Sequence, residues 1–390
     1  MRATTNRLGA QLAASAVITV LSAGVAFAEP GVTDTTITFG QSAAFDGPAA
    51  ALGNGMRAGI LAAFAEANAA GGVNGRTLEV IQYDDGYEPD RAVENTQRLI
   101  LEDQVFAMIG AVGTPTSQAT QPIATEHNVP FIGPFTGAGF LRDPALTNVV
   151  NVRGSYDQET DAWIEYLTND LGLSRIAILY QDDGFGRAGL SGVHKAMEAR
   201  GIQLVAEGTY QRNTTAVRTA LLDIRKGDPE AVVIVGAYAP AAEFIRLANA
   251  INLDAVFMNI SFVGSGALAA DLGADGEGVM ITQVVPFPFD ASLPLVAEYH
   301  AALAAHDAAM QPEFVSLEGY IVGRLTVAAL GLVDGEPTRQ ALIEAIYAQG
   351  TFDLGGVQLT FGEGDNQGLD QVFLTEINAD GGFSAIARVF

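Results

Sequence analysis

The segment Tyr180-Gln181-Asp182-Asp183-Gly184-Phe185 closes an apolar stretch, and Gln82-Tyr83-Asp84-Asp85-Gly86-Tyr87 is nearly the same sequence earlier in the chain. The apolar residues that precede each copy are typical of a buried strand. We therefore expect two open α/β sheets. Open parallel sheets bind ligands just beyond the carboxyl ends of their strands, so two sheets whose carboxyl ends face each other would form a cleft.

Strands alternate with helices on both sides of residue 150, which predicts the α/β class with parallel sheets covered on both faces. In the first half we expect strands at 36–40, 78–83, 105–110 and 129–133, and helices at 54–70, 90–101 and 115–127. In the second half we expect strands at 175–180, 202–206, 231–236, 255–259 and 278–285, and helices at 187–200, 214–226 and 239–251. Helices follow at 294–307, 314–333 and 338–348, and strands at 357–361 and 371–377. No flexible linker separates the halves, so a connecting strand and a hinge are expected near 150.

The two Asp-Asp copies hold different places in this pattern. The first copy follows the second strand of its half, whereas the second copy follows the first strand of its half. We therefore expect only the second copy, with Phe185, to reach the cleft. Asp84 and Asp85 are expected to cap the helix that follows them.

The first 28 residues have the three parts of a secretory signal. Arg2 and Arg7 are followed by an apolar run over 8–25, and Ala26 and Ala28 form a small-residue cleavage site. A membrane anchor is the alternative, but the run is short for a full span and is interrupted by serine, threonine and glycine. We expect export with cleavage after Ala28.

Charge and cysteine content narrow the function further. The 390 residues carry a formal net charge of -25 and contain no cysteine. Such a charge excludes nucleic acid and anionic membrane surfaces as partners and favours a monomer. The lack of cysteine excludes thiol catalysis, thiolate metal sites, disulfides and the lipid-bearing cysteine of an exported lipoprotein. A freely diffusing periplasmic protein of a Gram-negative cell is therefore expected.

The sequence offers few patterns for catalysis. Gly184-Phe185-Gly186-Arg187-Ala188-Gly189 follows a strand and opens a helix, as a dinucleotide-binding fingerprint does. However, Asp182 and Asp183 would repel a pyrophosphate there, so a plain helix start is expected. The Asp84-Asp85 and Asp182-Asp183 pairs each lie on one loop, so helix capping is expected and not a general acid and base that flank a substrate bond. The four histidines are scattered. We therefore expect no catalytic, metal or cofactor site, and we expect that the protein is not an enzyme.

Small hydroxyls mark two strand ends of the first half, in Gly113-Thr114-Pro115-Thr116-Ser117 and Gly133-Pro134-Phe135-Thr136-Gly137. Hydroxyls and free amides at helix amino termini can accept a small carboxylate. The second half adds Phe185, Gly236-Ala237-Tyr238 and Asn259-Ile260-Ser261-Phe262, which combine aromatic walls with polar tips. The alternative is that these residues only cap helices and fill the seam between the two halves.

At these residues the chain resembles the type I periplasmic solute-binding proteins of ABC importers, in the branched-chain amino-acid (leucine-binding) group. The resemblance covers essentially the whole mature chain, and the order and spacing of its segments are specific although each segment alone is weak. The segments are Asp46-Gly47-Pro48, Asn68-Ala69-Ala70-Gly71-Gly72-Val73-Asn74-Gly75, Tyr83-Asp84-Asp85, residues 110–117, Asp182-Asp183-Gly184-Phe185-Gly186 and Asp228-Pro229-Glu230-Ala231-Val232.

The resemblance implies two Rossmann-like lobes joined by a three-crossover hinge. Lobe 1 is expected to comprise 29–150 and about 281–361, and lobe 2 to comprise 151–280 and about 362–390. The lobes would close on an amino acid or a related small carboxylate or amide and dock on an inner-membrane permease and ATPase complex. An extracytoplasmic ligand sensor acting through a partner is the alternative. No transmembrane or signalling segment follows residue 390, so import is expected. An exported nucleotide-dependent enzyme is the third possibility.

The resemblance also implies a set of ligand-binding residues that share places at strand ends. Thr114 and Thr136 would hold the ligand carboxylate, and Phe185 and Tyr238 would supply aromatic contacts. The full set is Phe45, Thr114, Thr136, Phe185, Tyr238 and Ser261.

Two positions depart from the family pattern. The first-loop aromatic of leucine-binding relatives falls near Leu52, and the acidic residue that pairs with the ligand ammonium falls near Ser261. Loss of that carboxylate removes a charge-assisted hydrogen bond worth roughly 1.5–3 kcal/mol. Either Asp182 or Asp183 supplies the missing charge, or the solute is a carboxylate or amide without an amine.

Overall fold

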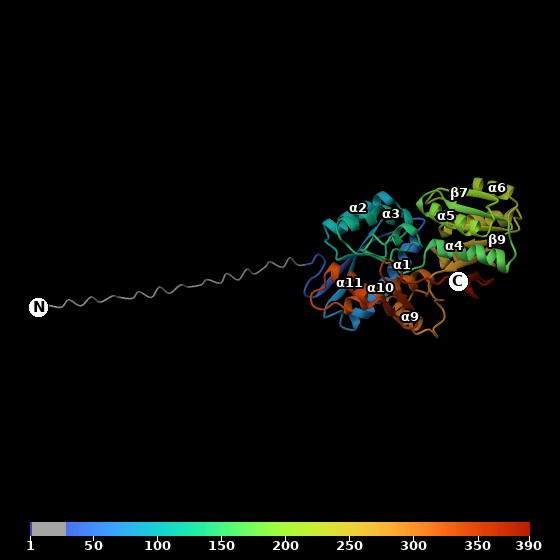
Figure 1. Ribbon diagram of the computed structural model, residues 1–390. Helices are drawn as coiled ribbons and strands as arrows, with labels where there is room; N and C mark the ends of the chain where they lie inside the picture. Colours follow the sequence, from blue (N-terminus) through green and yellow to red (C-terminus); the bar gives the residue numbers. More distant parts are fainter. Residues whose placement is uncertain (2–28) are drawn as a thin grey trace.

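The chain is described by a computed structural model that covers Met1 and residues 29–390. The predicted signal sequence falls almost wholly on residues 2–28, outside the described ones. The described chain forms two α/β lobes, each with its own large sheet. In Figure 1 the blue, teal and orange segments build one lobe, and the green and yellow segments with the red C-terminal strands build the other. The prediction of two α/β lobes is confirmed.

The sheet of lobe 1 is parallel throughout, with the order β2-β1-β3-β4-β5. Its strands are β1 (Thr36–Ala43), β2 (Thr77–Asp84), β3 (Ala107–Ile109), β4 (Phe131–Ile132) and β5 (Val149–Val150). Its helices are α1 (Ala50–Ala69), α2 (Pro89–Leu101), α3 (Thr114–Glu126), η1 (Gly139–Arg142), α9 (Pro294–His306), α10 (Phe314–Gly331) and α11 (Arg339–Gln349), with the hairpin β11 (Thr351–Asp353) and β12 (Gln358–Thr360).

The sheet of lobe 2 has the order β14-β13-β10-β9-β8-β6-β7, in which the pairs β10–β13 and β13–β14 are antiparallel and the other pairs are parallel. Its strands are β6 (Ile176–Gln181), β7 (Ala206–Tyr210), β8 (Ala231–Val235), β9 (Val256–Asn259), β10 (Met280–Gln283), β13 (Phe373–Ile377) and β14 (Phe383–Val389). Its helices are α4 (Tyr156–Glu165), η2 (Tyr166–Asp170), α5 (Gly184–Ala199), α6 (Arg218–Lys226), α7 (Tyr238–Ala250), η3 (Ser261–Val263), α8 (Ser265–Leu272) and η4 (Gly273–Gly276).

The two sheets share one strand order, and this order places the site. In each sheet the first strand lies between the second and the third, as β1 lies between β2 and β3 and β6 lies between β7 and β8. The chain order reverses at that point, and open α/β sheets bind ligands in the crevice outside the carboxyl ends of the strands there. The loops after β1, β3, β6 and β8 are therefore the natural walls of a ligand site.

The central strands are runs of apolar residues because they are buried on both faces of the sheet. The strand β8 reads Ala-Val-Val-Ile-Val and all of its residues are buried, because helices cover both faces of a parallel sheet. Helix α10 of lobe 1 is also largely apolar, and 78% of its residues are buried. Among the described residues it is the one helix long and apolar enough to cross a membrane. Helix α10 packs closely against α1. A Cβ at Gly59 of α1 would lie 1.9 Å from the carbonyl oxygen of Ser316 in α10, so no larger residue fits there. Helix α10 is a core helix of lobe 1.

The chain passes between the lobes after β5, after β10 and after β12. The first and third of these crossovers run side by side, joined by backbone hydrogen bonds. The amide of Asn151 donates to the carbonyl of Asn366 (2.8 Å), and the amide of Leu369 donates to the carbonyl of Val152 (2.9 Å). The expected connecting strand near residue 150 is β5, which leads directly into this paired hinge.

Candidate ligand-binding site

Five aromatic residues from both lobes meet at the carboxyl ends of the strands, and we call them the aromatic cluster. Tyr87 and Phe135 belong to lobe 1, Tyr156 follows the first crossover, and Phe185 and Phe262 belong to lobe 2; each is at most 1% exposed. The ring centre of Phe262 lies 4.6 Å from that of Phe185, 5.3 Å from that of Phe135 and 5.9 Å from that of Tyr87. Phe262 therefore links rings of the two lobes.

Three hydroxyls lie along one edge of the aromatic cluster. The Oγ1 atoms of Thr114 and Thr136 are 2.6 Å apart, and the Oγ1 of Thr136 is 3.3 Å from the hydroxyl of Tyr156. Burial raises the pKa of Tyr156, so this phenol stays protonated and can donate. Thr114 is the first residue of α3, whose free amides and dipole favour an anion. The turn before it needs Gly113, because a Cβ there would lie 2.2 Å from the ring of Tyr87.

The start of α5 is capped by its own carboxylate. Asp183 accepts hydrogen bonds from the amide of Phe185 (2.9 Å) and from Nε2 of Gln181 (2.7 Å), and it pairs with Arg212 (3.0 Å). This carboxylate occupies the position that a pyrophosphate would take in a dinucleotide site. The glycine-rich segment is therefore a capped helix start, as the sequence predicts.

The two aspartates proposed as partners of a ligand ammonium have other partners. Asp183 is held as described, and Asp182 pairs with Arg187 (2.9 Å) and is exposed. Neither carboxylate is free to face the aromatic cluster, so the idea that they replace the missing charge at Ser261 is not supported.

The expectation that Asp84 and Asp85 cap the next helix is wrong, because α2 has no side-chain cap. Asp84 instead accepts hydrogen bonds from the amides of Phe45 (2.8 Å) and of the residue after it, joining the loop after β2 to the loop after β1. Asp85 accepts from Oγ of Ser42 (2.9 Å) and from the amide of Tyr87 (2.8 Å). These bonds hold Tyr87 in the aromatic cluster, so the first Asp-Asp copy also reaches the site.

A buried ion pair lies against the aromatic cluster. Nε of Arg153 is 2.9 Å from Oε1 of Glu318, and Nη2 donates to Oε2 of the same carboxylate (3.1 Å). The two side chains are 1% and 3% exposed. The guanidinium carbon of Arg153 lies 4.4 Å from the ring centre of Phe135, within the range of a cation–π contact.

The ion pair extends into lobe 2 through a serine. Nη2 of Arg153 donates to Oγ of Ser261 (2.8 Å), and Ser261 donates from Oγ (2.9 Å) and from its amide (2.8 Å) to Glu159. Glu159 also accepts from Oγ1 of Thr282 (2.5 Å). Burial raises the pKa of Glu159, and the charge of Arg153 opposes that shift. We call Arg153, Glu159, Ser261 and Glu318 the charged network; it joins the hinge, α4 and α10.

The structure brings together part of the predicted set. Thr114, Thr136 and Phe185 lie at the aromatic cluster. Ser261 lies beside it in the charged network, and its neighbour Phe262 enters the cluster instead.

Two predicted residues lie at the start of α1 instead. The hydroxyl of Tyr238 is 3.4 Å from the amide of Ala51, a contact between the lobes. The half-buried ring of Phe45 lies 4.7 Å from the guanidinium carbon of Arg57. The side chain of Leu52, where relatives carry an aromatic, would touch a Cβ at Gly264 of lobe 2 at 2.5 Å. Phe45 and Tyr238 thus flank one edge of the interface, and their ligand roles stay predictions.

Sequence reasoning missed several residues at the site. Phe135 and Phe262 lie within the segments predicted to form the site, but the ligand roles were predicted for their neighbours Thr136 and Ser261. A charged residue within the apolar run 314–330 was a usable signal for Glu318. Arg153 lies 165 positions from that partner, and no local pattern connects the two. Tyr87 ends the first Asp-Asp segment but was not assigned to the site, and Tyr156 and Glu159 lie in α4, for which no helix was predicted.

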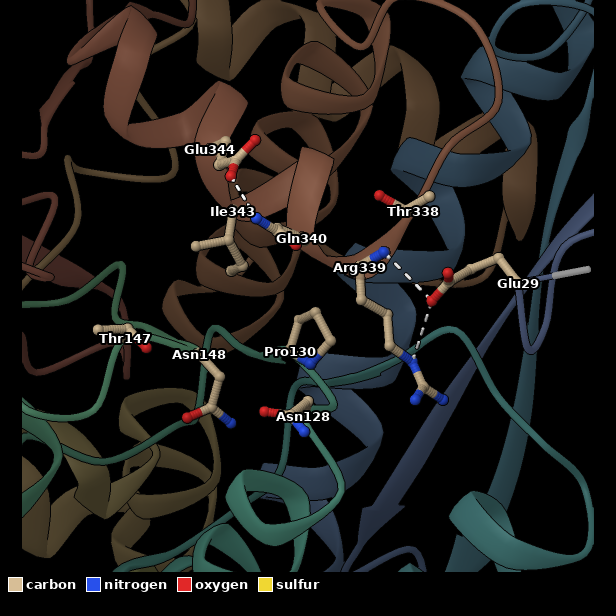
Figure 2. A pocket seen from close by; sticks show the side chains of 10 residues that line it. All are labelled: Glu29, Asn128, Pro130, Thr147, Asn148, Thr338, Arg339, Gln340, Ile343 and Glu344. Carbon is tan, nitrogen blue, oxygen red and sulfur yellow. Dashed lines mark hydrogen bonds and ion pairs between the residues drawn. The ribbon is translucent and has the colours of Figure 1, made fainter. Parts of the chain in front are cut away.

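A cavity of about 680 Å³ lies elsewhere in lobe 1, and Figure 2 shows its lining side chains. Asn128 and Asn148 lie just before β4 and β5, so the cavity opens at the amino ends of these strands. The first turn of α11 forms another wall, where Arg339 lies 3.7 Å from the carboxylate of Glu29. Parallel sheets bind ligands at their carboxyl ends. We therefore place the candidate site at the aromatic cluster and not at this cavity.

Comparisons with known proteins agree on one family. A family model described as periplasmic binding protein matches residues 36–382. The leucine-, isoleucine-, valine-, threonine- and alanine-binding protein of Pseudomonas aeruginosa is 26% identical over 372 residues, which cover 95% of this chain and 96% of that protein. The Leu/Ile/Val-binding protein of Escherichia coli is 22% identical over 62% of this chain and 65% of its own length.

Solved structures show the same fold. A possible leucine/isoleucine/valine-binding protein from Rhodopirellula baltica is 41% identical and superposes with a TM-score of 0.87, covering 90% of this chain and 96% of that chain. The solute-binding protein of an ABC transporter from R. palustris, solved in complex with benzoate, has a TM-score of 0.80 at 22% identity and covers 90% of this chain and 95% of that chain. The chain therefore belongs to the periplasmic binding proteins of the type I, leucine-binding group, a family that binds solutes and is not enzymatic.

Proposed function

We propose that this protein is the solute-binding component of an ABC importer, which captures a small carboxylate between its lobes and delivers it to an inner-membrane permease and ATPase complex. The observation that carries the proposal is the meeting of hydroxyls and aromatic rings from both lobes at the carboxyl ends of their strands. The relatives support it, since the Pseudomonas aeruginosa protein is named for binding leucine, isoleucine, valine, threonine and alanine, and one structural neighbour was solved with benzoate.

In this proposal Thr114 and Thr136 hold the carboxylate of the solute, and Phe185 contacts its body. Phe262 touches three rings of the aromatic cluster directly, so a solute that enters the cluster must displace this ring or separate the lobes. Ser261 acts by fixing the loop that carries Phe262. Tyr238 and Phe45 close the edge of the site at the start of α1.

Weak contacts between the lobes at the edge of the site would hold the closed form together. Arg212, after β7 in lobe 2, pairs with Glu88 of lobe 1 (2.8 Å), and Asn213 donates to the same carboxylate (2.7 Å). Exposed ion pairs of this kind contribute at most about 1 kcal/mol each. A solute that binds only the closed form can therefore shift the balance between open and closed lobes. We take 29–150 with about 281–361 as lobe 1, and 151–280 with about 362–390 as lobe 2.

The proposed location is the periplasm, after export and cleavage behind Ala28, with no lipid anchor. The family is periplasmic, and the signal pattern of the first 28 residues supports export. We propose that the protein works as a monomer, with the permease complex as its partner.

Calorimetry and thermal-shift measurements on the chain starting at Glu29 test solute binding, with amino acids, short and aromatic carboxylates and their amides as ligands. Binding of one class should raise the melting temperature by mass action. Stabilisation by no small solute would contradict the proposed function. Stimulation of the ATPase activity of a reconstituted permease complex by the loaded protein tests delivery, and binding without any stimulation would count for a sensor.

A further inference from the structure

We infer that the solute is an aromatic monocarboxylate without an ammonium group, and that Arg153 selects it by contacting its carboxylate. The inference rests on the proposed function and names the substrate class of the same site.

The carboxylates near the aromatic cluster already have hydrogen-bond or ion-pair partners, and Asp85 accepts from Ser42 and from the amide of Tyr87. Glu318 holds Arg153 through both of its oxygens. Glu159 accepts three hydrogen bonds from Ser261 and Thr282. Asp183 caps α5 and pairs with an arginine. A cation that leaves water for this site would lose its hydration without gaining a charged partner, which is strongly unfavourable.

Donors, in contrast, are available. Nη1 of Arg153 and Oγ of Ser117 are buried and have no hydrogen-bond partner within residues 29–390. Nε of Arg153 lies 2.9 Å from Oε1 of Glu318 in the ion pair without donating a hydrogen bond, and Nη2 donates to Glu318 and Ser261. Nη1 is therefore the nitrogen with neither kind of contact. Ser117 belongs to the same first turns of α3 that Thr114 begins. A buried donor without an acceptor is costly, so each of these groups would be stabilised by a ligand carboxylate placed within its reach.

The charge balance favours one carboxylate and not two. Among the paired charged groups at the cluster, Arg142 and Arg153 face Glu159 and Glu318, and Arg212 faces Asp183, so the formal charges of these six groups cancel. Arg142 donates to backbone carbonyls, including those of Thr136 (3.2 Å) and Arg153 (2.9 Å), and to the side-chain oxygen of Gln367 (2.8 Å). A single added negative charge is met by Nη1, the hydroxyls and the helix dipole of α3. A second one would have no comparable partner.

The rings of the aromatic cluster would contact the apolar part of the solute. Phe185 and Phe262 pack at 4.6 Å in a tilted geometry, and Tyr87 and Phe135 lie within 5.9 Å of Phe262. Tilted pairs at these distances are favourable for aromatic rings. A solute ring that takes the place of the Phe262 ring would make the same contacts, and its carboxylate would then lie toward the hydroxyls and Arg153.

A matched ligand series tests the substrate class by calorimetry on the mature chain. We use 3-phenylpropanoate, 3-phenylpropanamide, L-phenylalanine and 2-phenylethylamine, which share one ring and differ in their polar groups. We expect the acid to bind at least tenfold more tightly than the amide and L-phenylalanine, and the amine to bind weakest. Equal or tighter binding of L-phenylalanine, or tight binding only of aliphatic acids, overturns the inference and leaves the proposed function standing. Binding of no small solute overturns both.

Variants test the role of Arg153. Arg153→Lys keeps a charge for Glu318 but lacks the third guanidinium nitrogen. We expect it to lower the affinity for the acid tenfold or more and to leave the affinity for the amide nearly unchanged. A matched control is Arg339→Lys, because Arg339 contacts backbone carbonyls at the opposite end of lobe 1. Equal losses for acid and amide would show that Arg153 is only structural and would overturn its assignment.

A second variant keeps the test valid if Arg153→Lys does not fold. Ser117→Ala removes one orphan donor and leaves no partner unsatisfied. We expect it to weaken acid binding two- to fivefold and to leave amide binding unchanged. An acid-to-amide affinity ratio that stays at the parental value in the Ser117→Ala protein would overturn the placement of the carboxylate.

Discussion

The hydroxyl oxygens of Thr114 and Thr136 lie 2.6 Å apart, where the first turn of α3 meets the loop after β4. Both side chains are almost fully buried, and their hydroxyls are hydrogen-bonded to each other. A solute carboxylate that reaches this pair would accept from both hydroxyls at once, so the pair is preorganised for an anion.

Thr136→Val should weaken solute binding about tenfold without unfolding the protein, because it removes one hydroxyl donor at a strand end. Calorimetry with the best ligand measures the loss, and a thermal melt checks the fold. Unchanged affinity would show that the carboxylate binds elsewhere.

The same pair predicts a non-additive effect on stability. Thr136→Val leaves the buried hydroxyl of Thr114 without its partner, whereas Thr114→Val leaves the hydroxyl of Thr136 only its contacts with Tyr156 and the amide of Ala138. Each single change should lower the free energy of unfolding by about 1–2 kcal/mol. The double variant removes both groups, so its loss should be smaller than the sum of the single losses. Urea denaturation of the three variants completes the cycle. Additive losses would mean that the two hydroxyls do not depend on each other.

Much of the fold could be predicted from the sequence because the buried strands are short apolar runs between clear turns. The predicted strand 231–236 corresponds to β8 at Ala231–Val235. Helix α4 was missed although Ser155 and Gln158 form a capping box at its start. The antiparallel edge strand β14 was also missed, since one half-exposed strand gives a weak pattern.

The site could be predicted only as a group of loops. Strand order fixes which loops meet, but the direction of each side chain depends on contacts that no local pattern records. Ser261 and Phe262 show this, because neighbouring residues point into the charged network and into the aromatic cluster. The pairing of Arg153 with Glu318 depends on the return of α10 beside the hinge, which only the folded chain reveals.

Glu318→Ala should lower the free energy of unfolding by about 3–5 kcal/mol, because it leaves the charge of Arg153 buried without its partner. The double variant Arg153→Met with Glu318→Met should lose far less, since it removes both charges and keeps the volume. Urea denaturation measures both. A double variant less stable than Glu318→Ala would contradict a simple ion-pair role.

Tyr238→Ala should weaken solute binding severalfold and leave the fold intact. Tyr238 is half-buried, and its hydroxyl contacts the start of α1 across the interface between the lobes. Loss of this contact destabilises the closed arrangement of the lobes and leaves the hydrophobic core of each lobe unchanged. Calorimetry measures the affinity, and Leu222→Ala, a change of an exposed residue on α6, serves as the control. If Tyr238→Ala and Thr136→Val both keep the parental affinity, the cleft is misplaced.

Glu313 gives the protein a pH-dependent stability. Its Oε1 would lie 2.5 Å from a Cβ at Gly55 in lobe 1, and its Oε2 would lie 3.3 Å from a Cβ at Gly266 in lobe 2. Its partly buried position between these helices raises the pKa of Glu313 from 4.5 to about 7, because the charged carboxylate loses hydration there. Between these two values the folded chain binds more protons at Glu313 than the unfolded chain does, so this group stabilises the fold at low pH and loses that effect as the pH rises through 7.

Glu313→Gln should therefore remove this part of the pH dependence. We expect the variant to melt near the parental temperature at pH 5 and above it at pH 8, because glutamine has no charge to bury. Asp85, whose pKa burial raises from 3.8 to about 6, shifts stability in the same direction but is common to both proteins. Glu363→Gln, a change of an exposed residue, controls for net charge. If the difference in melting temperature between the Glu313→Gln and parental proteins is the same at pH 5 and pH 8, Glu313 is ionised in the folded chain throughout this range, and the buried neutral carboxyl between the lobes is ruled out.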